Sequence, residues 1–133
     1  MLKKKSKPDK TAYANALRLL AMREHSEQQL WKKLEQRDFD EIEISDAIEL
    51  LKSENYLSDQ RFAESYLRSR KLKLYGPERI RLELKERGVS SVIIDDVFNQ
   101  DEDFETTWFD IMQQAYHRKY GDSQPDEYQE KAK

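Results

Sequence analysis

The chain has 133 residues, of which 38% are charged and 37% hydrophobic, enough apolar material for one compact domain or a row of small units. Glycine and proline are scarce, with three residues each, which disfavours a turn-rich β-protein and favours helices. Cysteine is absent, so disulfides and thiolate metal sites are excluded and a reducing, cytoplasmic compartment is expected. No apolar run approaches the roughly 20 residues that span a bilayer, and no secretory signal follows the lysine-rich N-terminus.

The net charge is only −3, but the charges are gathered in blocks. Residues 1–10 carry five lysines against one acid, and residues 35–60 carry nine acids against two bases. Residues 61–88 reverse this with nine bases against four acids, whereas residues 89–111 carry seven acids and no lysine or arginine. Such an alternation suits docking on a protein, on a phosphate backbone, or on both together. The alternative is a set of solvated faces that pair within the molecule.

The first helices follow from local signals. Residues 1–10 are expected to form a disordered basic arm. A helix is predicted over residues 11–24, where apolar residues recur at helical spacing. Ser26 and Gln29 have the spacing of a capping box, so a second helix is predicted to begin there.

A third helix completes this first unit. Asp40 and Glu43 predict its start through a cap of the same kind, and Asn55 predicts its end. The three helices make a first repeat over residues 11–55.

The second unit, over residues 56–100, follows the same plan. Ser58 is expected to cap its first helix, and Pro77 suits the first position of the next helix. Gly88 predicts a helix end with positive φ. Asp38 lies fifty residues earlier and tolerates the left-handed region, so the same turn is expected in both units.

The two units are related by a constant offset of fifty residues without a gap. A repeat of this size indicates stacked copies of one supersecondary unit, each burying its apolar face. The expected fold is therefore all-α, with tandem three-helix repeats in an elongated arrangement. The matched pairs are Leu30–Ile80, Leu34–Leu84, Arg37–Arg87, Phe39–Val89, Ile42–Val92, Ile44–Ile94, Asp46–Asp96 and Ile48–Phe98, and upstream Leu17–Leu67, Arg18–Arg68, Met22–Leu72 and Arg23–Lys73.

A third copy begins and then fades over residues 101–133. An acidic linker is expected over residues 100–105, followed by a seventh helix whose apolar stripe includes Trp108 and Tyr116. Tyr120 and the glycine after it match the second unit at a spacing of forty-five. The third unit is incomplete, so either the protein is shortened or its end lies outside this sequence.

No catalytic constellation is evident. His25 and His117 are each expected to be solvated or capping histidines, because a metal site needs more converging ligands. The glycines stand alone, which excludes a phosphate-binding loop, and no nucleophile elbow occurs. Neither enzymatic activity, nor a metal, nor a cofactor is expected.

The basic stretch of the second unit is the candidate binding site. Arginine and lysine near an aromatic residue and a helix N-terminus can contact phosphates. Pairing of these cations with acidic helices of neighbouring units is the alternative. Trp31 lies outside the repeated core stripe, and its partial exposure would indicate a partner surface. The candidate residues are Arg68, Arg70, Lys71, Lys73, Tyr75, Arg79, Arg81, Lys85 and Arg87.

Several strings resemble the RecX family, bacterial modulators of the recombinase RecA. The strings are REHSEQQLWKKLEQRDFD, LKSENYLSDQRFAESYLRSRKLKLYGPERIRLELKERGVS and the C-terminal YHRKYG…QEKAK. The resemblance covers nearly the whole chain from Ala12 and is most specific over residues 56–88. Family members usually complete a third unit, which this sequence does not.

The resemblance implies a curved row of three-helix units that acts as a monomer without enzymatic activity. It implies binding to RecA filaments on DNA, in the filament groove or at its growing end, with restraint of ATP hydrolysis, strand exchange and repressor cleavage during DNA repair and the SOS response. Binding to single- or double-stranded DNA is also attributed to the family. A helical DNA-binding protein acting independently of RecA is the second hypothesis, against which the pI of about 5.5 argues.

Overall fold

The computed structural model describes residues 11–101 and 104–121, apart from the side chain of residue 105. Within these ranges the protein is built from helices and contains no strand, as predicted. The predicted basic arm, residues 1–10, and the end of the third copy, residues 122–133, lie outside the described residues. The helices are α1 (Ala12–Met22), α2 (Glu27–Gln36), α3 (Glu41–Ser53), α4 (Asp59–Leu72), α5 (Pro77–Glu86), α6 (Ser91–Gln100) and α7 (Phe104–Tyr120).

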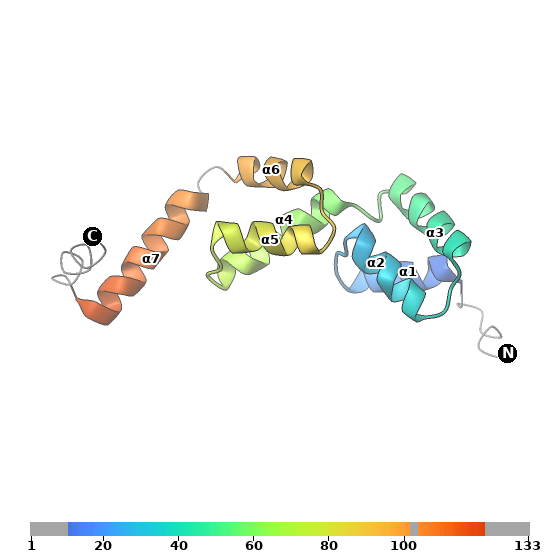
Figure 1. Cartoon of the computed structure of the whole chain (residues 1–133), viewed down its shortest axis with the longest axis horizontal. Helices are drawn as coiled ribbons and strands as arrows, with labels where there is room; N and C mark the ends of the chain where they lie inside the picture. Colours follow the sequence, from blue (N-terminus) through green and yellow to red (C-terminus); the bar gives the residue numbers. More distant parts are fainter. Residues whose placement is uncertain (1–10, 102–103, 122–133) are drawn as a thin grey trace.

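The helices are arranged as an elongated row. Helices α1–α3 lie at one end, α4–α6 in the middle and α7 at the other end, in a shallow arch (Figure 1). Helices α1–α3 enclose one apolar core and α4–α6 enclose a second. The predicted extended arrangement of tandem units is therefore observed.

The repeat of fifty residues is a repeat of the two cores. Leu30 and Leu34 of α2 are fully buried, and so are their counterparts Ile80 and Leu84 of α5. Each core also contains one residue from the segment that leads out of its unit. Leu57 closes the first core and Phe104 the second.

Local signals begin the helices as predicted, with one difference. The Ser26 hydroxyl accepts from the backbone N–H of Gln29, and the Gln29 side chain accepts from the N–H of Ser26, which completes the capping box. Asp40 likewise accepts from the N–H of Glu43. The Glu43 carboxylate, however, does not return this bond but accepts from the N–H of Ala12 at 3.0 Å, because the first turn of α1 leaves backbone donors unpaired.

The turn after the second helix is the same in both units. Asp38 has φ 70° and Gly88 has φ 88°, and the next residue in each case donates its N–H to the carbonyl of a buried leucine, Leu34 or Leu84. The predicted equivalence of these two turns is confirmed. Gly88 also lies so close to Gln28 that an added Cβ would come within 2.7 Å of its Cβ.

Helix α7 begins inside the segment predicted to be a linker. Phe104 is its first residue and packs into the second core, which fixes the start of the helix there. One turn later, Trp108 lies against Gly76, where an added Cβ would meet the indole at 3.1 Å. Beyond Trp108 the apolar stripe is partly or largely exposed, including Met112.

Candidate interaction surface

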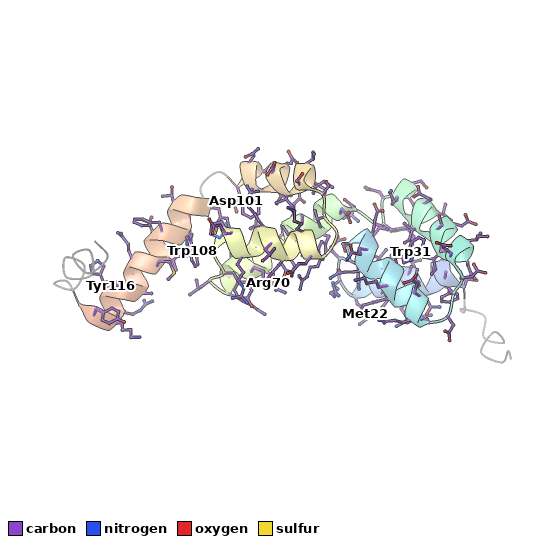
Figure 2. The ribbon with its side chains drawn as sticks, viewed as in Figure 1. Met22, Trp31, Arg70, Asp101, Trp108 and Tyr116 are labelled. Atoms are coloured by element: carbon purple, nitrogen blue, oxygen red, sulfur yellow. The ribbon has the colours of Figure 1, made fainter. Side chains whose placement is uncertain are left out.

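Figure 2 shows the side chains along the row, with Arg70 on the middle unit. The nine residues of the basic block divide into two groups. Arg68, Lys73 and Lys85 are exposed and have no ionic partner among the described residues. The remaining cations lie against carboxylates or aromatic rings of α4–α6 or of the segment that follows α6, and Tyr75 is half-buried among them.

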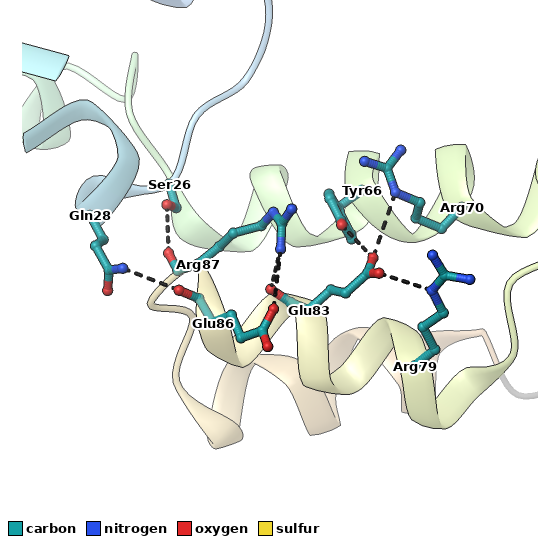
Figure 3. A network of polar contacts seen from close by, with 8 residues as sticks. All are labelled: Ser26, Gln28, Tyr66, Arg70, Arg79, Glu83, Glu86 and Arg87. Atoms are coloured by element: carbon teal, nitrogen blue, oxygen red, sulfur yellow. Dashed lines mark hydrogen bonds and ion pairs between the residues drawn. The ribbon is translucent and has the colours of Figure 1, made fainter. Parts of the chain in front are cut away.

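Glu83 is the centre of a polar network on α4 and α5 (Figure 3). Its carboxylate accepts a 2.5 Å hydrogen bond from the Tyr66 hydroxyl and lies 3.0 Å from Nε of Arg79 and 3.7 Å from Nε of Arg70. The hydrogen bond from Tyr66 and the positive charges of Arg79 and Arg87 hold the pKa of Glu83 below its ordinary value. Glu83 was missed at the sequence level, although its position four residues after Arg79 indicated an ion pair.

The same arginines stack on two tyrosine rings. The Arg79 guanidinium lies 3.6 Å from the ring centroid of Tyr75, and that of Arg70 lies 4.2 Å from the centroid of Tyr66. Arg87 covers the Tyr66 ring at 4.9 Å. Contacts between a cation and an aromatic ring stabilise the unit, most where they are shielded from water as at Arg70, so these cations contribute to packing as well as to surface charge.

Two further cations are paired with the acidic segment that follows. Lys71 lies 2.6 Å from Asp101, and Arg81 lies 2.8 Å from Asp95. Pairing with neighbouring units was the alternative considered for the block. The ion pairs of the candidate residues lie within α4–α6 and the residue that follows α6.

The exposed cations do not share one face. Arg68 follows the buried Tyr66 by two residues, about 200° round α4, and Lys85 follows the buried Ile80 by five residues, about 140° round α5. The two helices pack through their buried sides, so Arg68 and Lys85 point outward in different directions. The structure therefore brings Arg70, Arg79 and Arg87 to Glu83. It pairs Lys71 and Arg81 with other carboxylates and leaves Arg68 and Lys85 on outward faces of two different helices.

The first and second units are joined through the start of α2. Ser26 donates from its hydroxyl to the carbonyl of Arg87 at 2.7 Å, and Gln28 donates to the carbonyl of Glu86 at 3.2 Å (Figure 3). The backbone N–H of Glu27 donates to Asp59 at 2.8 Å. Burial raises the pKa of the Asp59 carboxyl despite that hydrogen bond.

Trp31 is partly buried, as expected, and packs against the first core. It lines an open groove of about 430 Å³ where α2 and α3 meet the second unit, with Asp59 and Gly88 on the far side. Glu27, which is paired with Lys52, also lines this groove.

Of the two alternatives expected for His25, a solvated side chain is wrong, whereas a contact at the end of a helix is observed. It is not solvated but 1% exposed, in the loop after α1, with Nδ1 3.0 Å from the carbonyl of Arg23. No local pattern indicates this burial, since the loop closes against α2 only in the folded unit. His117 is exposed in the last turn of α7.

Two family models match the chain in the order of its units. One describes the first three-helix domain of RecX and matches residues 12–51, and the other describes its second three-helix domain and matches residues 58–97.

The chain belongs to the RecX family.

Curated relatives agree with these matches. A regulatory protein RecX from Cronobacter sakazakii is 39% identical over an alignment of 140 residues that covers 95% of this chain and 83% of that protein. One from Haemophilus influenzae is 40% identical over 110 residues, covering 82% of this chain and 70% of its own length. RecX proteins are regulatory rather than enzymatic, as predicted for this chain.

Solved RecX structures have the same fold. A crystal structure of regulatory protein RecX superposes with a TM-score of 0.70 at 26% identity, over 82% of this chain. This chain spans only 55% of that longer one. RecX from Lactobacillus salivarius superposes with a TM-score of 0.73 at 24% identity, covering 72% of its chain, which supports the fold alone.

Neither a metal-binding cluster nor a membrane-spanning helix is found in the described residues. No group of three or more histidine or acidic side chains in residues 11–101 and 104–121 is arranged to hold a metal ion. None of the helices there is both long and apolar enough to cross a lipid bilayer.

Proposed function

We propose that this RecX family member binds RecA filaments assembled on DNA and restrains their ATP hydrolysis, strand exchange and repressor cleavage, in DNA repair and the SOS response. The supporting observation is the family match through both three-helix units, together with a 39% identical relative named as the regulatory protein RecX.

The architecture is suited to this role. An elongated row of similar units presents a long outer surface with alternating charge, as repeat proteins that bind extended partners do. The junction at Ser26 and Gln28 joins the first two units through hydrogen bonds to the end of α5. Such a row can follow a partner composed of both protein and nucleic acid.

The test is a titration of the protein into RecA bound to single-stranded DNA, with ATP hydrolysis as the readout. We expect the rate of hydrolysis to fall as the protein is added. Circular dichroism establishes that the added protein is folded. An unchanged rate at micromolar concentration of folded protein contradicts the proposal.

Within the basic block, we propose that Arg68, Lys73 and Lys85 are the cations that reach a partner, since they are exposed and unpaired among the described residues. Replacing all three by alanine is expected to weaken inhibition without loss of fold. Replacing Arg79 instead removes a charge that already pairs with Glu83, so this variant serves as the comparison. Equal inhibition by the triple variant and the wild type contradicts the assignment.

Direct DNA binding independent of RecA is the second candidate, favoured by the same three exposed cations. A protein that neutralises Z phosphates on single strands loses affinity with a log–log salt slope of about −0.7Z. Removing all three cations should then reduce the magnitude of the slope by about two. Absence of binding to DNA alone, with inhibition of RecA intact, excludes this candidate.

A further inference from the structure

The four most exposed large apolar side chains of the described residues form two repeat pairs. Met22 and Leu72 are 76% and 86% exposed, and Ile42 and Val92 are 75% and 76% exposed. Every other large apolar side chain described is at most 60% exposed. These four belong to the repeated pattern but lie outside its buried positions.

The shared fold explains only part of this coincidence. Equivalent positions of two similar units have similar exposure, but that does not require an apolar residue at either position. Single exposed apolar residues are common on protein surfaces. Here an apolar residue recurs at the most exposed positions of both units. Packing inside the unit does not explain this recurrence, since Met22 and Leu72 contribute to neither core.

Met22 and Leu72 also have the same charged neighbours. They are the last residues of α1 and α4. Exposed arginines, Arg18 and Arg68, precede them by four residues and therefore lie on the same face of each helix. Exposed Arg23 and Lys73 follow them directly. The dipole of a helix favours cations at its C-terminus, but it gives no reason for the apolar side chain between them.

We propose that Met22 and Leu72 are two equivalent contacts to a protein polymer, each entering an apolar, carboxylate-rimmed site on a different subunit. The apolar side chains favour a protein over a phosphate backbone, and methionine and arginine are enriched in protein interfaces. The flanking cations complement carboxylates at the rim. The protein has two equivalent contact sites, one in each three-helix unit, and a polymer presents the same site on each of its subunits. Binding at both sites at once strengthens the complex. This inference rests on the proposed function.

The experiment compares Met22→Ser, Leu72→Ser and the double variant for binding to RecA filaments on single-stranded DNA, measured by co-sedimentation. Burial of one such side chain is worth about tenfold in affinity. Each single variant should therefore bind about tenfold more weakly and the double variant about a hundredfold more weakly. Leu82→Ser is the control, because Leu82 is 57% exposed but its counterpart is Lys32.

The inference is overturned if the double variant binds as well as either single variant, or if Leu82→Ser loses as much affinity. It is also overturned if the variants weaken only binding to DNA alone, or if they abolish self-association in analytical ultracentrifugation while filament binding persists. A wild-type protein that does not bind the filament defeats the proposed function itself. Wild-type binding with unaffected variants defeats this inference alone.

Discussion

The hydroxyl of Ser26 donates a 2.7 Å hydrogen bond to the backbone carbonyl of Arg87, sixty-one residues later in the chain. Ser26 is fully buried and also caps α2. One hydroxyl therefore begins a helix in the first unit and satisfies a carbonyl at the end of α5 in the second. With Gln28 bonded to the preceding carbonyl, this contact couples the orientation of the two units to local helix capping.

Ser26→Ala removes both functions of this hydroxyl. Loss of an N-cap costs about 1 kcal/mol, and the unpaired carbonyl of Arg87 adds about 1–3 kcal/mol. Urea unfolding at neutral pH measures the sum. Ser90→Ala is the matched control, because Ser90 caps α6 from an exposed position and, within the described part of the chain, its hydroxyl accepts only from Ile93. Equal losses in the two variants contradict a role for Ser26 in joining the units.

Gly88→Ala tests the closeness of the junction. The substitution places a Cβ at positive φ and against the side chain of Gln28, so both backbone strain and overpacking destabilise the variant, by about 2–4 kcal/mol together. Gly121→Ala separates the two causes, because Gly121 has φ +84° and no atom of the described residues lies within 4 Å of an added Cβ. If both variants lose the same unfolding free energy in urea, the contact with Gln28 does not contribute to the destabilisation.

The sequence could predict features that depend on neighbouring residues. Three helix starts depend only on residues within one helical turn, namely the capping box of Ser26, the cap at Ser58 and the proline at the first position of α5, Pro77. The left-handed turns at Asp38 and Gly88 are also local, and the fixed offset made one predict the other. Periodicity identified the two cores for the same reason, since Leu34 and Leu84 repeat their burial.

Features that depend on distant packing could not be predicted. Glu43 accepts from Ala12, thirty-one residues away, because α1 and α3 are adjacent in the fold. Charge pattern alone left open whether the basic block was free or paired. Only the packing of α4 against α5 places Tyr66 and Arg70 at Glu83.

Glu83→Gln is expected to destabilise the second unit. Glutamine can still accept from Tyr66, but it loses the charge that pairs with Arg79 and Arg70, at a cost of about 1–2 kcal/mol. Because the folded-state pKa of Glu83 is lowered, its stabilisation is present above the ordinary carboxyl pKa and is lost as pH falls through the folded value.

Urea unfolding at pH 7 and again at acidic pH checks both parts of this prediction for Glu83. Glu78→Gln is the control, since Glu78 is exposed in the first turn of α5 and has no ion pair among the described residues. The difference in unfolding free energy between Glu83→Gln and the wild type should become smaller at acidic pH. If this difference in unfolding free energy does not change with pH, the loss of stability comes from packing rather than from the charge of Glu83.

His25 makes the stability of the first unit depend on pH in the opposite sense to a buried carboxyl. Its Nδ1–H donates to the carbonyl of Arg23, and the buried Nε2 has no hydrogen-bond partner among the described residues. Burial, followed by the charge of Arg23, lowers the pKa of His25. The unfolded chain therefore takes up a proton first as pH falls below about 6.5, so stability decreases from there until the folded form is protonated too.

His25→Asn is expected to remove this dependence, because the asparagine amide can keep the bond to the carbonyl of Arg23 without titrating. The unfolding free energy of wild type and variant is measured in urea between pH 7 and pH 5, and their difference should change steadily on acidification in favour of the variant. The total change in this free-energy difference gives the difference between the pKa values of His25 in the unfolded and folded states, at about 1.4 kcal/mol for each pH unit. His117→Asn, at an exposed position of α7, controls for the loss of an imidazole. Parallel curves for His25→Asn and the wild type contradict the assignment, since a buried histidine that stays neutral must oppose folding in acid.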